Sequence, residues 1–460
     1  MTTTTSQHRE FGLWRSTSLV VGNIVGSGIF LLPASLGIYG AVGLFGWMVT
    51  SVGSICLALI FARLSAHFPK IGGPYAYSKE AFGDFVGFQM AWSYWVGTWA
   101  SNAAIATAFV SYMSVFWPSL ATNATHAFAL AFCSVWFFTG LNIWSVKSTG
   151  IAQVVIVVLK IVPLIVIGLF GSFYVNFAHF SPVNPSGLPW FTALSSAAAL
   201  TLYAFLGLES ATVPAESVVD PKITIPRATV IGTVLSAVIY VWTTIVLLGV
   251  LPPQQLAKSA APFAEAAGLL FGPWASSGVA ICAAIAAFGT LNGWILIQGQ
   301  MPLAAAQDGL FPKAFAKLSK RGTPVFGLLA SSILMTGMLI LNYQASLVEQ
   351  FTAIVTFTTF SMLIPYLYSA MADLVFLVTK ADYVSKAHLA RSVIVATIGL
   401  AYTVLIVIGC GQKAVFLGML CMFAGFPIYI FMRYSPSSCS SSRLNESAKL
   451  RSATHIDSLE

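Results

Sequence analysis

Charged side chains are scarce in this sequence: Asp, Glu, Lys and Arg make up 8% of its 460 residues, and hydrophobic residues make up 57%. Soluble domains have about a quarter of their residues charged, so the composition predicts an integral membrane protein. Cysteine is scarce as well. Five of the six cysteines lie in apolar runs, and no pair has metal-site spacing. We therefore expect no disulfide, no bound metal and no cofactor.

The sequence also lacks the motifs of several functional classes. There is no P-loop, so the energy for any transport should come from an ion or substrate gradient. No charge ring or filter motif favours a channel. His126 and His179 stand alone, without the partners that enzyme chemistry needs. The net charge of +8 is divided among many short loops, which argues against nucleic acid as a partner.

The apolar runs predict an all-α membrane protein with twelve transmembrane helices. These runs lie near residues 17–38, 41–62, 85–116, 126–146, 150–173, 190–215, 228–251, 274–303, 324–342, 349–378, 391–409 and 414–432. The Thr-rich residues 1–14 and the Ser-rich, charged residues 434–460 are expected to be disordered. A single transmembrane domain should therefore occupy residues 15–433.

The distribution of basic residues supports this count. With both termini placed in the cytoplasm, nineteen of the 22 Lys and Arg residues fall on the cytoplasmic side. Lys258 and Lys413 fall on the other side, and Lys160 lies within a span. A miscounted helix would scramble this asymmetry, so the positive-inside rule favours twelve spans with both termini cytoplasmic, in the cell (inner) membrane.

The first apolar run is interrupted by the segment Gly22–Phe30, which contains three glycines and a serine. Such a segment is poor material for a continuous helix. A helix broken inside a bilayer exposes backbone N–H and C=O groups, so it is a candidate binding site for an ion or substrate. The alternative is that Gly22 and Gly26 merely allow close helix packing.

A second break is predicted in the sixth run, at residues 205–211, where Gly207 stands beside Glu209. Breaks in spans 1 and 6 are five helices apart, which predicts two five-helix repeats of inverted topology. Spans 11 and 12 lie outside the repeats and could support a homodimer. A carboxylate in hydrocarbon is a functional residue by default, although Glu209 could also be a structural hydrogen-bond acceptor.

Several motifs together resemble the amino acid–polyamine–organocation superfamily, over roughly residues 10–432. The first is Gly22–Phe30 followed by Leu31-Leu32-Pro33. The others resemble the branch of arginine/agmatine antiporters and other basic amino acid/polyamine antiporters: Tyr203–Ala211, Asn292-Gly293-Trp294, Asp308–Pro312 and Pro365–Tyr368. This resemblance implies a LeuT-like fold of five plus five inverted helices with helices 1 and 6 broken, plus helices 11 and 12.

An amino acid substrate presents a carboxylate and an ammonium group. Backbone N–H groups near Gly26, Ser27 and Gly28 would suit the carboxylate, and carbonyl groups near Asn23, Ile24 and residues 203–205 would suit the ammonium. The resemblance implies that Trp294 stacks on a guanidinium, unless it is only a packing residue. The expected substrate-binding residues are Asn23, Ile24, Gly26, Ser27, Gly28, Gly97, Thr98, Asn102, Tyr203, Phe205, Trp294 and Thr358.

Four residues are expected to control gating or proton transfer. The resemblance implies a cytoplasmic-side gate made of Tyr94, Glu209 and Tyr366, with Glu209 linked to the response to pH. Lys160 is a departure from the antiporter branch, and a lysine at this point occurs in proton-coupled relatives. It could carry a proton, brace the broken helix, or extend to the membrane interface.

Two transport functions therefore remain open. The first is an exchanger of a basic amino acid, such as arginine, for its decarboxylated amine, such as agmatine, or for a related amino acid. The alternative is a proton-coupled amino acid symporter of broader specificity that uses Lys160. In either case the partners are small amino acid and amine substrates and the lipid bilayer, and the protein is not an enzyme.

Overall fold

A computed structural model describes residues 12–26, 28–68, 74–144, 150–209, 218–380 and 382–434. All regular elements in this described part of the chain are helical. Nine of its helices are long and apolar enough to cross a membrane, and α1 with α2, bent by 44° at their junction, makes a tenth candidate span. The predicted class, an all-α membrane protein, is confirmed.

The helices follow one another through the whole described chain. Their bounds are α1 Leu13–Ile24, α2 Gly28–Gly37, α3 Val42–His67, α4 Pro74–Phe82, α5 Asp84–Met113, α6 Ser119–Thr122, α7 Ala124–Trp144, α8 Gly150–Gly171, η1 Ser172–Tyr174, η2 Phe177–Phe180, α9 Trp190–Tyr203, α10 Pro221–Val250, α11 Pro253–Leu256, α12 Pro262–Phe271, α13 Pro273–Gln307, α14 Val325–Asn342, α15 Leu347–Thr379, α16 Lys386–Gly409 and α17 Gly411–Tyr434.

Two of the twelve predicted spans correspond to helices outside these ten candidates. One is α5, which has 30 residues and buries polar side chains such as Gln89, Ser93 and Asn102 against its neighbours. The other is α9, which has 14 residues and ends at Tyr203, two residues before the predicted break at residues 205–211. The count of twelve spans stays a prediction.

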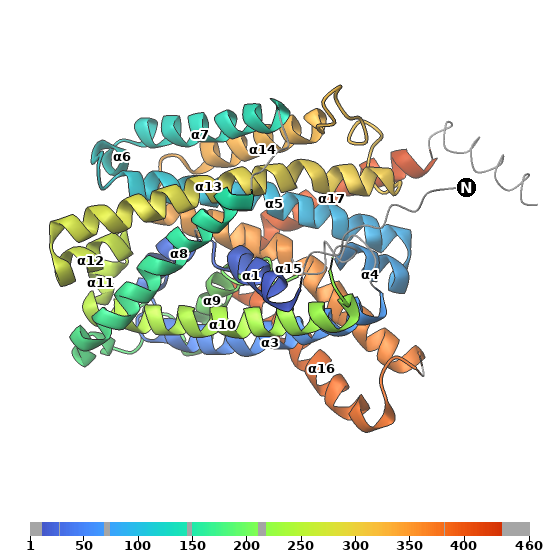
Figure 1. Cartoon of the computed structure of the whole chain (residues 1–460), viewed down its shortest axis with the longest axis horizontal. Helices are drawn as coiled ribbons and strands as arrows, with labels where there is room; N and C mark the ends of the chain where they lie inside the picture. Colours follow the sequence, from blue (N-terminus) through green and yellow to red (C-terminus); the bar gives the residue numbers. More distant parts are fainter. Residues whose placement is uncertain are drawn as a thin grey trace, which may run out of the picture.

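The long helices pack in two connected groups. In one group α5 packs against both α13 and α15, and in the other α10 packs against α1 and α3 while α3 packs against α9. Helix α8 contacts α10 and α13, and it crosses between them in the view of Figure 1. Helix α15 contacts α2, α3 and α9 and so joins the two groups. The short helices α1 and α9 thus each pack against longer ones, α1 against α10 and α9 against α3, α15 and α16.

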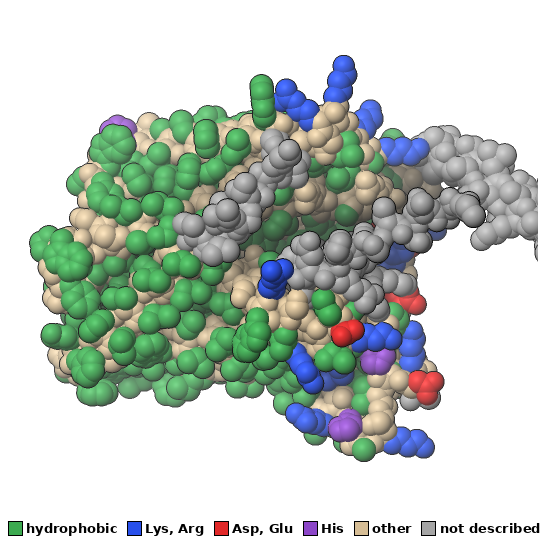
Figure 2. All heavy atoms as spheres, viewed as in Figure 1, with side chains coloured by type: hydrophobic (Ala, Val, Ile, Leu, Met, Phe, Trp, Pro, Cys, Tyr) green, Lys and Arg blue, Asp and Glu red, His purple; other side chains and the backbone are tan. Residues whose placement is uncertain are grey.

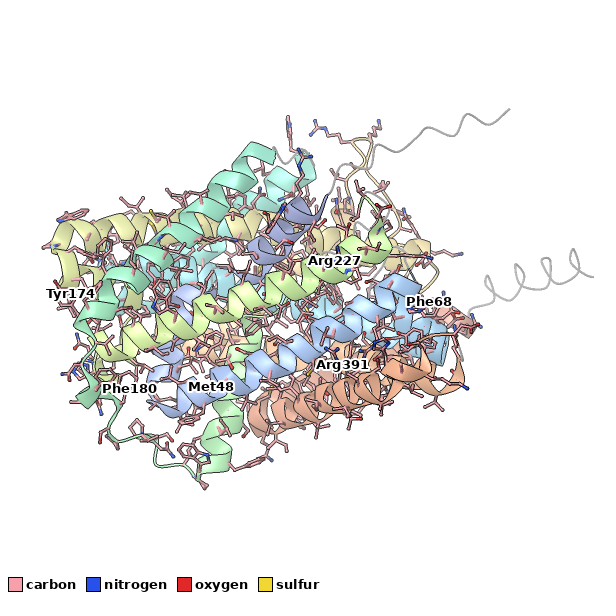
Figure 3. The ribbon with its side chains drawn as sticks, turned by 60° about the horizontal axis from the view of Figure 1, so that its bottom comes forward. Met48, Phe68, Tyr174, Phe180, Arg227 and Arg391 are labelled. Atoms are coloured by element: carbon pink, nitrogen blue, oxygen red, sulfur yellow. The ribbon has the colours of Figure 1, made fainter. Side chains whose placement is uncertain are left out.

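Charge is segregated along the long direction of the helices. Lys and Arg side chains gather toward one end of the visible face, and hydrophobic side chains cover most of the rest (Figure 2). Figure 3 places Phe68, Arg227 and Arg391 at this end, which we call the basic end, and Met48, Tyr174 and Phe180 toward the opposite end. An apolar belt with charges at its edge is the surface expected of a bilayer-spanning protein.

A buried ion pair ties three elements together at the basic end. Arg63 of α3 donates to Asp373 of α15 through Nε (3.2 Å) and Nη2 (2.5 Å), and Asp373 has no exposed surface. Tyr383, between α15 and α16, donates to Asp373 Oδ1 at 2.8 Å. Burial and the adjacent Asp373 raise the pKa of the Tyr383 phenol, so it remains a proton donor at neutral pH. Sequence reasoning did not single out Asp373.

Close helix packing leads to a stability prediction at Gly409. A Cβ atom at this position would collide with the carbonyl oxygen of Ser195 in α9. Gly409→Ala should therefore destabilise the protein by about 1–3 kcal/mol, the usual cost of overpacking. Thermal unfolding of the purified protein in detergent measures this change. Gly337→Ala is the matched control, because a Cβ atom there meets open space. An equal midpoint for the two variants would contradict such close packing of α16 on α9.

Candidate functional site

The first predicted break is present between α1 and α2. Helix α1 ends at Ile24, and Val25 leaves the helical conformation with φ −71° and ψ 74°. Helix α2 begins at Gly28, after a direction change of 44°. Ser27, the residue expected to bind the carboxylate, lies outside the described residues. The break leaves the last carbonyl groups of α1 and the first N–H groups of α2 without partners in their own helices.

The second predicted break directly contacts the first. Helix α9 ends at Tyr203, and residues 204–209 continue as turns. Gly207 has φ +101°, a conformation that residues with a side chain rarely adopt. A Cβ atom on Gly207 would lie 3.4 Å from both Cβ and the carbonyl oxygen of Asn23. The two breaks therefore meet at one depth, as inverted repeats would place them.

Tyr240 of α10 contacts both breaks. Its hydroxyl group is within hydrogen-bond distance of the carbonyl oxygens of Ile24 (2.7 Å) and Ala204 (3.1 Å), and the residue has no exposed surface. A phenol has one proton, so it can fully satisfy only one of the two carbonyl groups at a time. Sequence reasoning missed this residue. The available signal was a tyrosine near the middle of the predicted span 228–251, whose hydroxyl group needs a partner.

A small cavity of about 30 Å³ lies between the breaks. It is lined by Asn23, Ile24, Gly26, Gly28, Ile29, Ser101, Ile105, Tyr203, Ala204, Leu206, Thr290 and Trp294. This volume accommodates about one water molecule, so an amino acid enters only if an aromatic wall moves. The Tyr203 ring is such a wall: a Cβ atom on Gly28 would lie 2.5 Å from it, and Ser101 Oγ lies 3.2 Å from its hydroxyl group.

The structure brings together half of the predicted substrate-binding residues. Asn23, Ile24, Gly26, Gly28, Tyr203 and Trp294 line the cavity. The other described residues of the set, which do not line it, are Gly97, Thr98, Asn102, Phe205 and Thr358. Ala204, which also lines the cavity, belongs to the range 203–205 whose carbonyl groups were expected to suit the ammonium group. Sequence reasoning missed the remaining cavity-lining residues, which are Ile29, Ser101, Ile105, Leu206 and Thr290.

The five predicted residues outside the cavity wall have other surroundings. Gly97 allows close approach of Met362, since a Cβ atom would lie 2.6 Å from that side chain. Thr98 donates to the carbonyl oxygen of Tyr94 at 2.7 Å. Phe205 packs edge-on against the rings of Trp47 and Tyr240. Thr358 and Asn102 are fully buried, and each has a side-chain oxygen without a hydrogen-bond partner among the described residues.

The predicted gating residues form one hydrogen-bonded cluster. Glu209, only 2% exposed, accepts from the Tyr94 hydroxyl of α5 at 3.0 Å and from the Tyr366 hydroxyl of α15 at 2.5 Å. The Gly207 amide donates to the Tyr366 hydroxyl at 3.4 Å. The cluster links the second break to both α5 and α15. Any separation of these elements must therefore break hydrogen bonds to a buried carboxyl group.

Lys160 of α8 contacts the other break. Its Nζ atom donates to the carbonyl oxygen of Gly22 at 3.3 Å, and the side chain is 4% exposed. Gly22 lies in the last turn of α1, where the helix dipole is negative. The ammonium group is thus placed where backbone dipoles favour a cation. The side chain is thus enclosed by protein.

Comparison with known sequences gives consistent matches along the chain. The family of amino acid permeases matches residues 11–432. A putrescine transporter of Haemophilus influenzae is 33% identical over 93% of this chain and 98% of its own length. A cadaverine/lysine antiporter of Escherichia coli is 34% identical over 80% of this chain and 83% of its own. A putative arginine/ornithine antiporter of Bacillus subtilis is 32% identical over 93% of this chain and 97% of its own length.

Tyr240 provides a test of the junction between the breaks. Tyr240→Phe keeps the ring but removes the hydroxyl, so the carbonyl groups of Ile24 and Ala204 lose a buried donor. We expect amide exchange in residues 204–209 to rise about tenfold, corresponding to roughly 1.4 kcal/mol for one hydrogen bond. Hydrogen–deuterium exchange with mass spectrometry measures this change.

Tyr112→Phe is the matched control for this experiment. The Tyr112 hydroxyl is equally buried, but it donates to the carbonyl oxygen of Phe30 in α2 at 2.6 Å. Its loss should affect exchange in α2 and leave residues 204–209 unchanged. Identical exchange of residues 204–209 in Tyr240→Phe and the unmodified protein would show that Tyr240 does not stabilise the break.

Proposed function

Because this chain belongs to the amino acid permease family, within the amino acid–polyamine–organocation superfamily, we propose that it exchanges a basic amino acid for an amine across a membrane. It is a multi-pass membrane transporter and not an enzyme. The proposed pair is arginine and its decarboxylated amine, agmatine, or a related amino acid. The observation that carries the proposal is the cavity where two broken helices meet an aromatic wall formed by Tyr203 and Trp294.

The names of the relatives support this substrate class. Putrescine, cadaverine, lysine, arginine and ornithine all carry a cationic nitrogen at the end of a short aliphatic chain. An exchanger of an amino acid for its decarboxylated amine must bind one substrate that has a carboxylate and one that lacks it. Recognition of the shared cationic end is therefore the common requirement, and Trp294 supplies a π-face suited to it.

We assign the two ends of the substrate as follows. The N–H group at Gly28 receives the carboxylate at the start of α2, where the helix dipole is positive, with Ser27 beside it. The N–H group of Gly26 donates to the carbonyl oxygen of Ile24 at 2.6 Å and joins them when that bond opens. Carbonyl groups at Asn23, Ile24 and Tyr203 receive the ammonium group. The side chain extends along Trp294, with Asn102, Thr358, Gly97, Thr98 and Phe205 forming the surroundings of the expanded pocket. Tyr203 closes over the bound substrate.

The proposed gate on the cytoplasmic side is the cluster of Tyr94, Glu209 and Tyr366. Its two phenols hold Glu209 between α5 and α15, and substrate release requires these contacts to open. We further propose twelve spans as two inverted five-helix repeats plus α16 and α17. Both termini then face the cytoplasm of a bacterial inner membrane, the membrane domain occupies residues 15–433, and α16 and α17 are available for a homodimer.

One observation favours a second function. The contact between Lys160 and Gly22 places an ionisable amine directly on the broken helix. An amine that gained and lost a proton there would change the backbone's environment in each transport cycle. This arrangement would suit a proton-coupled amino acid symporter of broader specificity.

Transport into liposomes distinguishes the two functions. Purified protein is reconstituted, and uptake of radiolabelled arginine is followed with arginine, agmatine, putrescine or buffer inside. Exchange predicts uptake with an internal substrate and none into empty vesicles, even under a proton gradient. Uptake into empty vesicles driven by a proton gradient would contradict exchange and establish symport.

Variants at Lys160 extend this measurement. If Lys160 only braces α1, Lys160→Ala should weaken exchange and proton-driven uptake alike. If it carries the proton, proton-driven uptake should be lost while exchange survives. Lys258→Ala is the control, because Lys258 is exposed in the segment between α11 and α12. Altered transport in this control would show that loss of a surface charge explains the effect.

A further inference from the structure

Four buried polar side chains form a chain of hydrogen bonds that begins beside the cavity. Asn102 of α5 donates through Nδ2 to Gln298 Oε1 of α13 at 2.6 Å. Gln298 Nε2 donates to Ser332 Oγ of α14 at 3.2 Å. Ser332 Oγ lies 2.7 Å from Thr139 Oγ1 of α7. All four residues are at most 1% exposed, and their helices lie together in the upper part of Figure 1.

The number of available protons fixes the direction of this chain. The Thr139 hydroxyl group donates its proton to the carbonyl oxygen of Val135 at 2.8 Å. Thr139 must therefore accept from Ser332, and Ser332 must then accept from Gln298. The Gln298 oxygen consequently faces Asn102, which must donate to it. The reversed arrangement gives up the bond from Thr139 to Val135 and so has one hydrogen bond fewer.

The direction of this hydrogen-bond chain determines which atom of Asn102 is left without a partner. One N–H of the Asn102 amide nitrogen donates to Gln298, which fixes the orientation of the amide group. Its Oδ1 atom is a fully buried acceptor without a hydrogen-bond partner among the described residues. A buried acceptor without a hydrogen bond destabilises the folded protein, so a ligand that donates to it would bind favourably. Asn102 lies one turn from Ile105, and Gln298 one turn from Trp294, on the same faces of their helices as these cavity-lining residues.

We infer that Gln298 is a positioning residue for substrate selectivity. Through Ser332 and Thr139 it holds Asn102 with its acceptor oxygen free, so that the pocket favours a side chain ending in N–H donors. The inference rests on the proposed function, since it names the feature that selects a cationic end. A freely rotating Asn102 amide could serve donors and acceptors equally and would discriminate less.

Lysine and norleucine are suitable probes because they differ by the terminal amine. Their Kd values are measured by isothermal titration calorimetry on the detergent-purified protein. Gln298→Leu should reduce the preference for lysine about tenfold, as expected for a weakened hydrogen bond to a charged donor. Norleucine affinity should stay unchanged, which a general packing defect would not produce.

One further variant keeps the test independent of folding at position 298. Thr139→Val removes the far end of the chain and should lower the preference, although Thr139 does not line the cavity. Thr107→Val is its matched control, because the buried Thr107 hydroxyl bonds to Ala103 of its own helix.

The outcomes separate this inference from the proposed function. An unmodified protein that binds norleucine as well as lysine would overturn the proposed substrate class and this inference together. An unmodified protein that prefers lysine, with the preference unchanged in Gln298→Leu and Thr139→Val, would overturn the inference alone. If Gln298→Leu fails to fold, the lysine preference of Thr139→Val is compared with that of its control Thr107→Val. A lower preference in Thr139→Val alone supports the inference, and equal preferences in the two variants overturn it.

Discussion

The breaks in α1 and α9 place backbone N–H and C=O groups at a depth where lipid offers no hydrogen-bond partner. These groups must be satisfied by protein or by a molecule bound between the breaks. Tyr240 supplies one donor to the carbonyl groups of Ile24 and Ala204, and Lys160 supplies another to Gly22. The N–H groups that begin α2 at Gly28 need acceptors instead, which neither of these donors provides. That remaining polarity makes the junction suited to a charged ligand.

The same junction is coupled to the surrounding helices by a few specific contacts. Glu209 joins the second break to α5 and α15 through two phenols, and Lys160 joins the first break to α8. Tyr240 joins both breaks to α10. A movement of either break therefore changes hydrogen bonds on several helices at once. This coupling is the physical basis on which a transporter can link occupancy of the cavity to opening at one end.

Much of this arrangement could be predicted from sequence, because glycines and a carboxyl group in apolar runs are strong local signals. Both breaks were predicted in this way, and the same signal singled out Glu209, which the structure places at the second break. The orientation of a side chain around its helix has no comparable signal. Gly97 and Phe205 were expected to line the pocket, but they pack against neighbouring helices. Tyr240 was missed because its partners are backbone carbonyl groups, which are the same for every sequence.

The position of bound substrate is the most direct test of this account. An experimental map of the protein in lipid nanodiscs with saturating L-arginine would provide it. The account predicts density between the two breaks, with the carboxylate against the start of α2 near Gly28 and the guanidinium beside Trp294. Density for arginine elsewhere, with the junction of the breaks closed as it is around Tyr203, would contradict the account.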